Sequence, residues 1–197
     1  MSSREFILAN VRRRQPPAAA LPAVPRFERP PVDLPVAFGD ALAAMGGRLA
    51  VPAGGQSLDE VVASLFPGAA NVCSATPQVR GSRDVASVQD PRELSDVDVG
   101  VVRAAFGVAE TGSVALSERE FGVNALGFLS QHLVVLLDPA AILADLATAY
   151  RQPWWREVRY GTLLTGPSAT ADIEGVLVRG AQGIRSLTVV LAGAAGG

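Results

Sequence analysis

The sequence predicts a three-layer α/β domain, with a mostly parallel sheet flanked by helices, that follows an N-terminal helix and a proline-rich arm. From Ala37 onward, helical periodicity alternates with short apolar runs of strand length, which is typical of a parallel sheet. Seven of the fourteen prolines lie between Arg14 and Pro35, where they exclude a helix interior or a sheet ladder. We therefore expect a helix and arm over residues 1–36 and one domain over residues 37–197.

The first helix is expected over residues 3–13. Ser2 and Glu5 have the spacing of a capping box ahead of an apolar stretch. The basic cluster Arg12–Arg14 favours a solvated helix end stabilised by the helix dipole over a contact with an anionic partner. The apolar residues scattered along the arm indicate that it lies against its own domain or a neighbouring subunit.

Three further helices follow from capping signals and apolar spacing. The clearest spans residues 57–66, where Ser57 and Glu60 form a capping box. A second is expected after Asp138, because a proline occupies its first position and apolar residues follow at helical spacing. A third is expected over about residues 167–178.

Short apolar runs between these helices predict the strands. They are too short to cross a membrane, which takes about 20 apolar residues, so no membrane span is expected. The predicted strands are residues 48–51, 71–73, 99–104, 113–116, 133–137, 162–164 and 187–191.

Composition excludes several classes of function. The chain has 17 basic and 19 acidic residues, so it lacks the positive field that drives nucleic-acid binding. Every basic residue is arginine, which excludes Schiff-base chemistry and a P-loop lysine. The N-terminus lacks the basic-then-apolar order of a secretory signal, so we expect a cytoplasmic protein.

Cys73 and His132 are the only residues of their kinds. One cysteine cannot form a disulfide framework or hold an iron–sulfur cluster or zinc ion within one chain, so no cofactor is expected in this chain. His132 opens an apolar strand, where packing is the favoured role. Spacing alone leaves a Ser-His-acid triad open, although no Gly-x-Ser-x-Gly motif is present.

The first candidate site is the turn at Glu110, between two predicted strands. An ionised carboxylate at the end of a buried strand must be hydrogen-bonded, so Glu110 either serves a site or accepts bonds from nearby backbone amides. Thr111 and Gly112 favour a tight turn, and we include them as candidate ligand-binding residues beside a candidate catalytic Glu110.

A second candidate site follows the predicted strand at residues 162–164. Gly166 and Ser168 lie in a small-residue turn ahead of the third predicted helix, whose amino end would attract an anion. Thr170 is an alternative cap, and Asp172 lies where the dipole favours negative charge. Simple capping explains these residues equally well.

Arg185 lies in a loop ahead of the last predicted strand. A fixed guanidinium at this position would bind a carboxylate or phosphate. A pair with a surface acid is the alternative.

Three segments together resemble the LUD-domain family, which includes lactate utilization protein C. They are Asp96–Gly100, Phe106–Ser113 with its Ala-Glu-Thr-Gly motif, and Gly166–Glu174 with its Gly-Pro-Ser and Ala-Asp-Ile-Glu motifs. Order and spacing agree with the family from about residue 46 to residue 192. Ala169 departs from the basic or polar residue common in the family, and Gln182–Ile184 departs from its His-Gly-Pro, so an anion held at these positions would be bound differently here.

The resemblance implies a fold like that of sugar-phosphate isomerases and CoA transferases. It also implies participation in the oxidation of L-lactate to pyruvate, with separate iron–sulfur partner subunits that carry the redox cofactors. This chain would then be an accessory, non-redox subunit, in which Glu110, Ser168, Asp172 and Arg185 line a pocket for a small carboxylate or other anion, or for a loop of a partner.

Two other functions remain open from the sequence. By analogy with the glutamate of CoA transferases, Glu110 would attack a thioester in a stand-alone CoA transferase or acyl hydrolase. No second acid–base group is identified for that reaction. A sensor would instead bind a small carboxylate without turning it over.

Overall fold

The computed structural model describes the chain except residues 1, 21, 23–31, 171–176 and 194–197. The chain divides into two compact units, Met1–Pro30 and Pro31–Gly197. Within the described residues, no helix is both long and apolar enough to cross a membrane.

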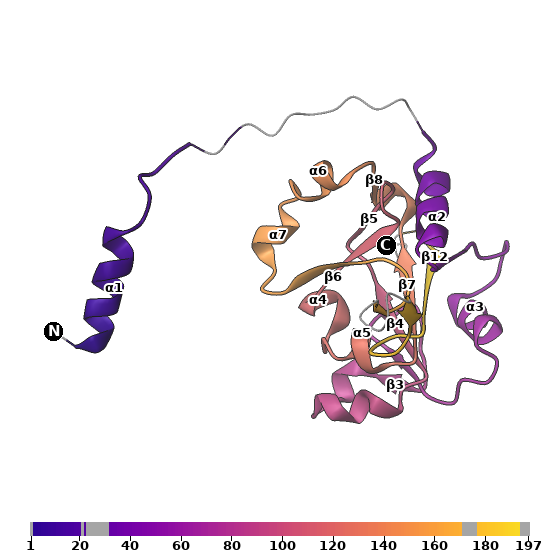
Figure 1. The fold of residues 1–197 in the computed structure, drawn as a ribbon. Helices are drawn as coiled ribbons and strands as arrows, with labels where there is room; N and C mark the ends of the chain where they lie inside the picture. The colour runs from indigo at the N-terminus through magenta and orange to yellow at the C-terminus, as the bar shows by residue number, and fades with distance from the viewer. Residues whose placement is uncertain (1, 21, 23–31, 171–176, 194–197) are drawn as a thin grey trace. The chain divides into compact units, whose positions relative to one another are not determined.

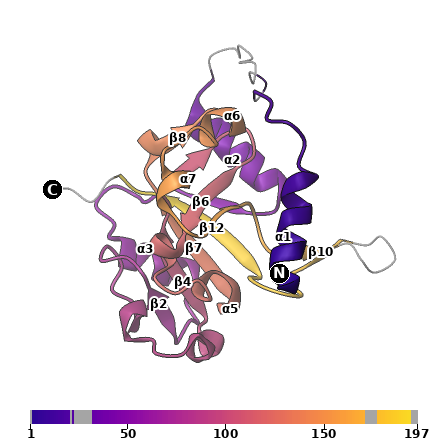
Figure 2. The ribbon, with the colours of Figure 1, turned by 90° about the vertical axis from the view of Figure 1, so that its left-hand side faces the viewer.

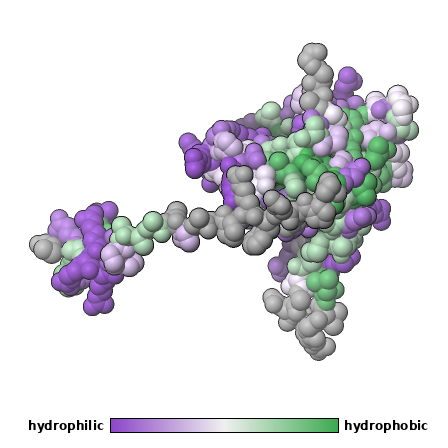
Figure 3. Space-filling view, turned by 90° about the horizontal axis from the view of Figure 1, so that it is seen from above, coloured by the Kyte–Doolittle hydropathy of each residue, from purple (hydrophilic) through white to green (hydrophobic). Residues whose placement is uncertain are grey.

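The first unit contains helix α1, Ser3–Arg13, at the position predicted. The Ser2 hydroxyl accepts a bond from the Glu5 amide, and Glu5 Oε2 accepts one from the Ser2 amide at 2.7 Å, which confirms the capping box. None of the helix residues is buried, and the helix surface is largely hydrophilic in Figure 3. Residues 21 and 23–31 of the arm, which include the apolar Val24 and Phe27, lie outside the described residues.

The second unit is built on a six-stranded sheet in the order β1-β12-β7-β4-β2-β3, and all of its strand pairs are parallel (Figure 1). The central strands β7 and β12 pair over their whole lengths. The prediction of a mostly parallel α/β sheet is confirmed. The strands are β1 Arg48–Ala50, β2 Val72–Ser74, β3 Arg83–Asp84, β4 Val99–Arg103, β7 His132–Leu137 and β12 Ser186–Leu191.

The two faces of this sheet are covered by different elements. Along β7, Leu133, Val135 and Leu137 pack into one apolar cluster, and Val134 and Leu136 pack into another on the opposite face. Helix α3, Leu58–Leu65, contributes to the second cluster. The first cluster includes side chains from α2 Leu34–Ala44, α4 Glu118–Phe121 and α5 Leu126–Leu129. The ribbon views show these helices around the central sheet (Figures 1 and 2).

A second sheet of four short strands, in the order β8-β5-β6-β9, packs beside the first. Its β5–β6 hairpin carries the Glu110 turn, and β9 pairs with β6. The strands of this sheet are β5 Phe106–Val108, β6 Ser113–Ser117, β8 Ile142–Leu143 and β9 Gly161–Leu164. The unit also contains 3-10 turns at Val85–Ser87, Pro91–Asp96 and Pro139–Ala141. Two short helices, α6 Leu146–Ala149 and α7 Trp154–Glu157, precede β9.

The helix predicted after Asp138 is wrong. A 3-10 turn, strand β8 and helix α6 occupy that segment instead. Ile142 and Leu143 pair with β5, so tertiary pairing overrides the helical spacing of the apolar residues.

The helix predicted over residues 167–178 is also wrong in the described residues 167–170 and 177–178, while residues 171–176 lie outside the described part of the chain. Ala169–Thr170 (β10) pairs antiparallel with Val178–Arg179 (β11) in a two-stranded hairpin. The described part of the segment therefore has extended backbone, and no helix begins at Pro167 to present free amides to an anion.

The arm was expected to extend through Pro35, and this prediction is wrong at its end. Helix α2 begins at Leu34, and Asp33 caps it by accepting a bond from the Val36 amide at 3.2 Å. Proline is tolerated in the first turn of a helix, because the backbone N–H that it lacks would have no acceptor within the helix there.

Candidate functional site

The turn between β5 and β6 is fixed by close packing against helix α2. Gly112 has a φ of +64°, and a Cβ at this position would lie 2.2 Å from the Leu42 backbone nitrogen. Its amide donates to the carbonyl of Val108 at 2.9 Å, closing the turn. Only glycine combines this backbone conformation with so close an approach.

Three hydroxyl groups form a continuous chain beside this glycine. The Ser113 hydroxyl lies 2.7 Å from that of Thr111 and also hydrogen-bonds the hydroxyl of Thr165. Ser113 is buried, so these partners offset the loss of its bonds to water. We call Glu110–Ser113 together with Thr165 the hydroxyl turn; it joins the β5–β6 turn to the end of β9.

Glu110 is exposed, and its carboxylate binds backbone. Its Oε2 accepts a bond from the Leu146 amide at 2.9 Å, at the start of helix α6, and its own amide donates to the Ala144 carbonyl at 3.2 Å. The side chain thus has the amide-binding role that the sequence left open, although the amide belongs to the first residue of helix α6 and not to the turn itself. Its exposure also leaves it accessible to a partner or substrate.

Gly166 and Ser168 hold the loop that follows β9. Gly166 has a φ of +66°, and a Cβ there would lie 2.4 Å from the Met45 carbonyl oxygen. The Ser168 hydroxyl donates to the Gln182 carbonyl at 2.8 Å, and its amide donates to the Ile184 carbonyl at 3.0 Å. Both of these bonds of Ser168 therefore go to the backbone of the Gln182–Ile184 segment.

Thr170 and Asp172 follow in the hairpin segment. Thr170 lies in β10, opposite Val178. Asp172 lies outside the described residues.

Arg185 lies in a different group of side chains, at the amino ends of three neighbouring parallel strands. Its amide donates to the Gln131 carbonyl at 2.7 Å. Its side chain lines a cavity of about 280 Å³ that we call the amino-edge pocket. The lining residues are Phe66, Gly68, Ala69, Asp98, Gln131, His132 and Arg185.

His132 lies between the charged residues of this pocket. Its Nδ1 lies 2.7 Å from the Ser186 hydroxyl, and its ring centroid lies 4.9 Å from that of Phe66. Burial lowers the pKa of His132, and the positive charge of Arg185 lowers it further, whereas Asp98 opposes the change. The imidazole is therefore neutral at neutral pH.

Asp98 supplies the negative charge of the pocket. Its Oδ2 accepts bonds from the amides of Ala70 at 2.8 Å and Asn71 at 2.9 Å. These bonds from Asn71 and Ala70 lower the pKa of Asp98 below its usual range, so the carboxylate is ionised at neutral pH.

The structure thus divides the candidate residues predicted from sequence. Glu110, Thr111 and Gly112 lie in the hydroxyl turn, while Arg185 lines the amino-edge pocket. Asp98 and His132 were not predicted as site residues. The sequence signal for them is their position directly before or at the start of a predicted strand, but only the strand order brings those starts together.

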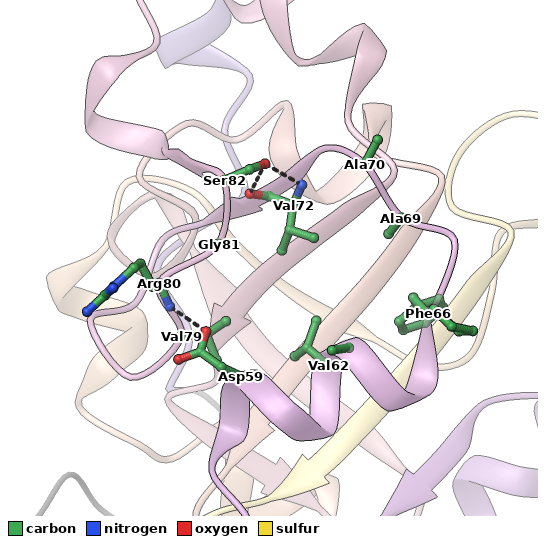
Figure 4. Close-up of a pocket in the computed structure, with 12 residues that line it drawn as sticks. Asp59, Val62, Phe66, Ala69, Ala70, Val72, Val79, Arg80, Gly81 and Ser82 are labelled. Carbon is green, nitrogen blue, oxygen red and sulfur yellow. Dashed lines mark hydrogen bonds between the residues drawn. The ribbon is translucent and has the colours of Figure 1, made fainter.

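A larger cavity of about 530 Å³ adjoins the amino-edge pocket, and the two share Phe66 and Ala69 (Figure 4). It lies between α3 and the segment from β2 to Ser82, and most of its lining is apolar. Its acid, Asp59, accepts a bond from the Arg80 amide at 2.9 Å. Across the described residues, no group of three or more His, Cys, Asp and Glu side chains is arranged to hold a metal ion.

Comparisons with known proteins agree with this architecture. The family model of the LUD domain matches residues 58–192. A crystal structure of a DUF162 family protein from Deinococcus radiodurans is similar, with a TM-score of 0.63 and 21% identity over 81% of this chain and 96% of that chain. No curated protein matches the chain. At this identity, the structural similarity shows the fold alone.

Proposed function

Because the chain belongs to the LUD-domain family, which is associated with lactate utilization, we propose that it is an accessory, non-redox subunit in the oxidation of L-lactate to pyruvate. The observation that carries this proposal is the family match, which spans most of the second unit. In the proposed reaction L-lactate loses two electrons and two protons. The electrons pass to iron–sulfur partner subunits.

The chemistry of Cys73 supports this division of labour. It is the only cysteine, it is fully buried, and burial raises the pKa of its thiol. A neutral, inaccessible thiol is a poor nucleophile and a poor redox group. In the proposed subunit, this chain would bind a small molecule or hold partner subunits in place.

The experiment that tests the proposal is L-lactate-driven dye reduction in extracts of the source organism. We expect deletion of the gene to abolish the activity and the wild-type chain to restore it. Unchanged lactate oxidation in the deletion strain would contradict the proposal. A chain that carries Gly54→Ala should restore the activity as the wild-type chain does, because a Cβ at Gly54 meets no atom within 4 Å.

A stand-alone CoA transferase or acyl hydrolase is the second candidate, and the exposure of Glu110 favours it. In that reaction the carboxylate would attack the thioester carbonyl, form a mixed anhydride and release CoA as the thiol. Incubation with an acyl-CoA would then leave a hydroxylamine-sensitive adduct on Glu110. The accessory-subunit proposal predicts no adduct, and a small-carboxylate sensor would show binding without turnover.

A further inference from the structure

We propose that the amino-edge pocket binds a small carboxylate that carries a hydrogen-bond donor on the adjacent carbon, as 2-hydroxy and 2-amino acids do. This inference deepens the proposed function and rests on it for the choice of L-lactate as the first ligand. Arg185, Asp98 and His132 line this pocket and would contact the ligand.

Arg185 is the group that would hold the carboxylate. Its backbone is fixed by the bond to Gln131, and Gly180 packs against it so closely that a Cβ there would lie 3.1 Å from the Arg185 Cα. The side chain is exposed at the cavity. A guanidinium presented from a fixed backbone pairs with a carboxylate through two parallel hydrogen bonds.

Asp98 restricts the ligand to one that also donates a hydrogen bond. Its Oδ2 is held by two backbone amides, so the carboxylate has a fixed orientation on the wall of the pocket. A hydroxyl or ammonium group would be accepted there, whereas a second negative charge would be repelled. The pocket therefore disfavours phosphate and dicarboxylates.

His132 lies between these two residues because the strands are in register. It pairs with Val99, the residue after Asp98, and with Ser186, the residue after Arg185. Its Nδ1 is engaged by Ser186, so Nε2 is the other polar atom of the ring. Phe66 packs against the imidazole and gives the pocket an apolar wall for a short alkyl group. The volume of about 280 Å³ suits a ligand of a few carbons.

The test uses the imidazole NMR signals of His132, which are unique because the chain has one histidine. The full chain is titrated separately with L-lactate, L-alanine, pyruvate and inorganic phosphate. We expect a saturable shift with L-lactate, a weaker response to pyruvate, which lacks the donor, and none with phosphate. If only L-alanine gives a saturable shift, the proposed site and its ligand chemistry are supported, and its ligands are 2-amino acids.

Two arginine variants make the test specific. Arg185→Gln should weaken binding by at least about tenfold, because a charged pair to the carboxylate is lost. Arg156→Gln, at an exposed arginine outside the pocket, should bind as the wild-type chain does. The proposal is overturned if none of the carboxylates shifts His132 at concentrations up to about 10 mM, or if Arg185→Gln binds normally.

This outcome is independent of the deletion experiment. If the chain binds L-lactate but its deletion leaves lactate oxidation intact, the proposed function is contradicted and the proposed site is supported. Loss of lactate oxidation on deletion, without binding, would contradict the site and keep the function.

Discussion

The hydroxyl turn and the amino-edge pocket both gather polar side chains, but they satisfy them in different ways. In the hydroxyl turn, neutral hydroxyls bond to one another beneath a glycine packed on α2. In the amino-edge pocket, Asp98 and Arg185 line the cavity with opposite charges, together with the neutral ring of His132.

This difference predicts a structural role for the hydroxyl turn and a binding role for the amino-edge pocket. Polar groups that satisfy one another inside the fold mainly hold it in one conformation, whereas charges at a cavity have unused capacity for a ligand. We therefore expect changes in the hydroxyl turn to act on the free energy of unfolding. Changes in the amino-edge pocket should act on binding and on pH dependence.

The largest effect is expected for Gly112→Ala. The new Cβ would meet the backbone of α2 at 2.2 Å, and alanine is strained at a φ of +64°. We expect the free energy of unfolding to fall by about 3 kcal/mol or more, measured by urea denaturation. The control Gly54→Ala, which meets no atom within 4 Å, should change it by less than about 1 kcal/mol. Equal effects of the two variants would show that Gly112 is not closely packed.

Ser113→Ala should have the next largest effect. It removes the middle hydroxyl of the chain and leaves Thr111 and Thr165 each without one partner, at a cost of about 1–3 kcal/mol in the same assay. The exposed Ser95→Ala serves as the matched control. In a double-mutant cycle, Thr165→Val should cost less in the Ser113→Ala background than in the wild-type chain. Additive costs would contradict the hydroxyl chain.

The correctly predicted strands are those whose apolar pattern is visible in the sequence without knowledge of the strands that they pair with. Leu133–Leu137 is buried on both faces of the sheet, so every position is apolar and the run is visible in the sequence. The two-residue strands β8 and β10 were missed because they exist only through their pairing with β5 and β11. Apolar residues in such segments also fit helical spacing, which produced the two wrong helices.

The same distinction applies to the two groups of polar residues. A tight turn at Gly112 could be predicted because the small residues that form it are adjacent in the chain. The amino-edge pocket could not, because Asp98, His132 and Arg185 meet only through the strand order β4-β7-β12. His132 was accordingly interpreted as a packing residue, and it does pack against Phe66.

Glu110→Gln tests whether the exposed edge of the hydroxyl turn contributes to stability. Glutamine keeps an acceptor for the Leu146 amide but loses the charge, so the free energy of unfolding should change by less than about 1 kcal/mol. Thermal unfolding of the variant measures this change. Loss of lactate-driven dye reduction in a variant of unchanged stability would assign Glu110 to function, whereas a large loss of stability would make it part of the scaffold.

The smallest effect concerns the pH dependence contributed by His132. Burial lowers its pKa in the folded chain, with Arg185 and Arg48 adding to this effect and Asp98 opposing it. The unfolded chain therefore binds a proton at a higher pH than the folded chain does. The stability contributed by the neutral ring is full above the ordinary histidine pKa of about 6.5 and is lost as the pH falls from there toward the folded value.

Measurements of the free energy of unfolding between about pH 7.5 and 5.5 isolate this contribution, because unperturbed carboxyl groups titrate near pH 4 and the pKa of Asp98 is lower still. We expect a small fall in stability across this range for the wild-type chain and a flatter profile for His132→Asn. Identical slopes would mean that the imidazole titrates as it does in water, which would contradict the half-buried, charge-flanked position of His132 in the pocket. A bound carboxylate would add negative charge near the ring and oppose the effect of Arg185, so L-lactate should raise the pKa of His132 and reduce the difference in slope.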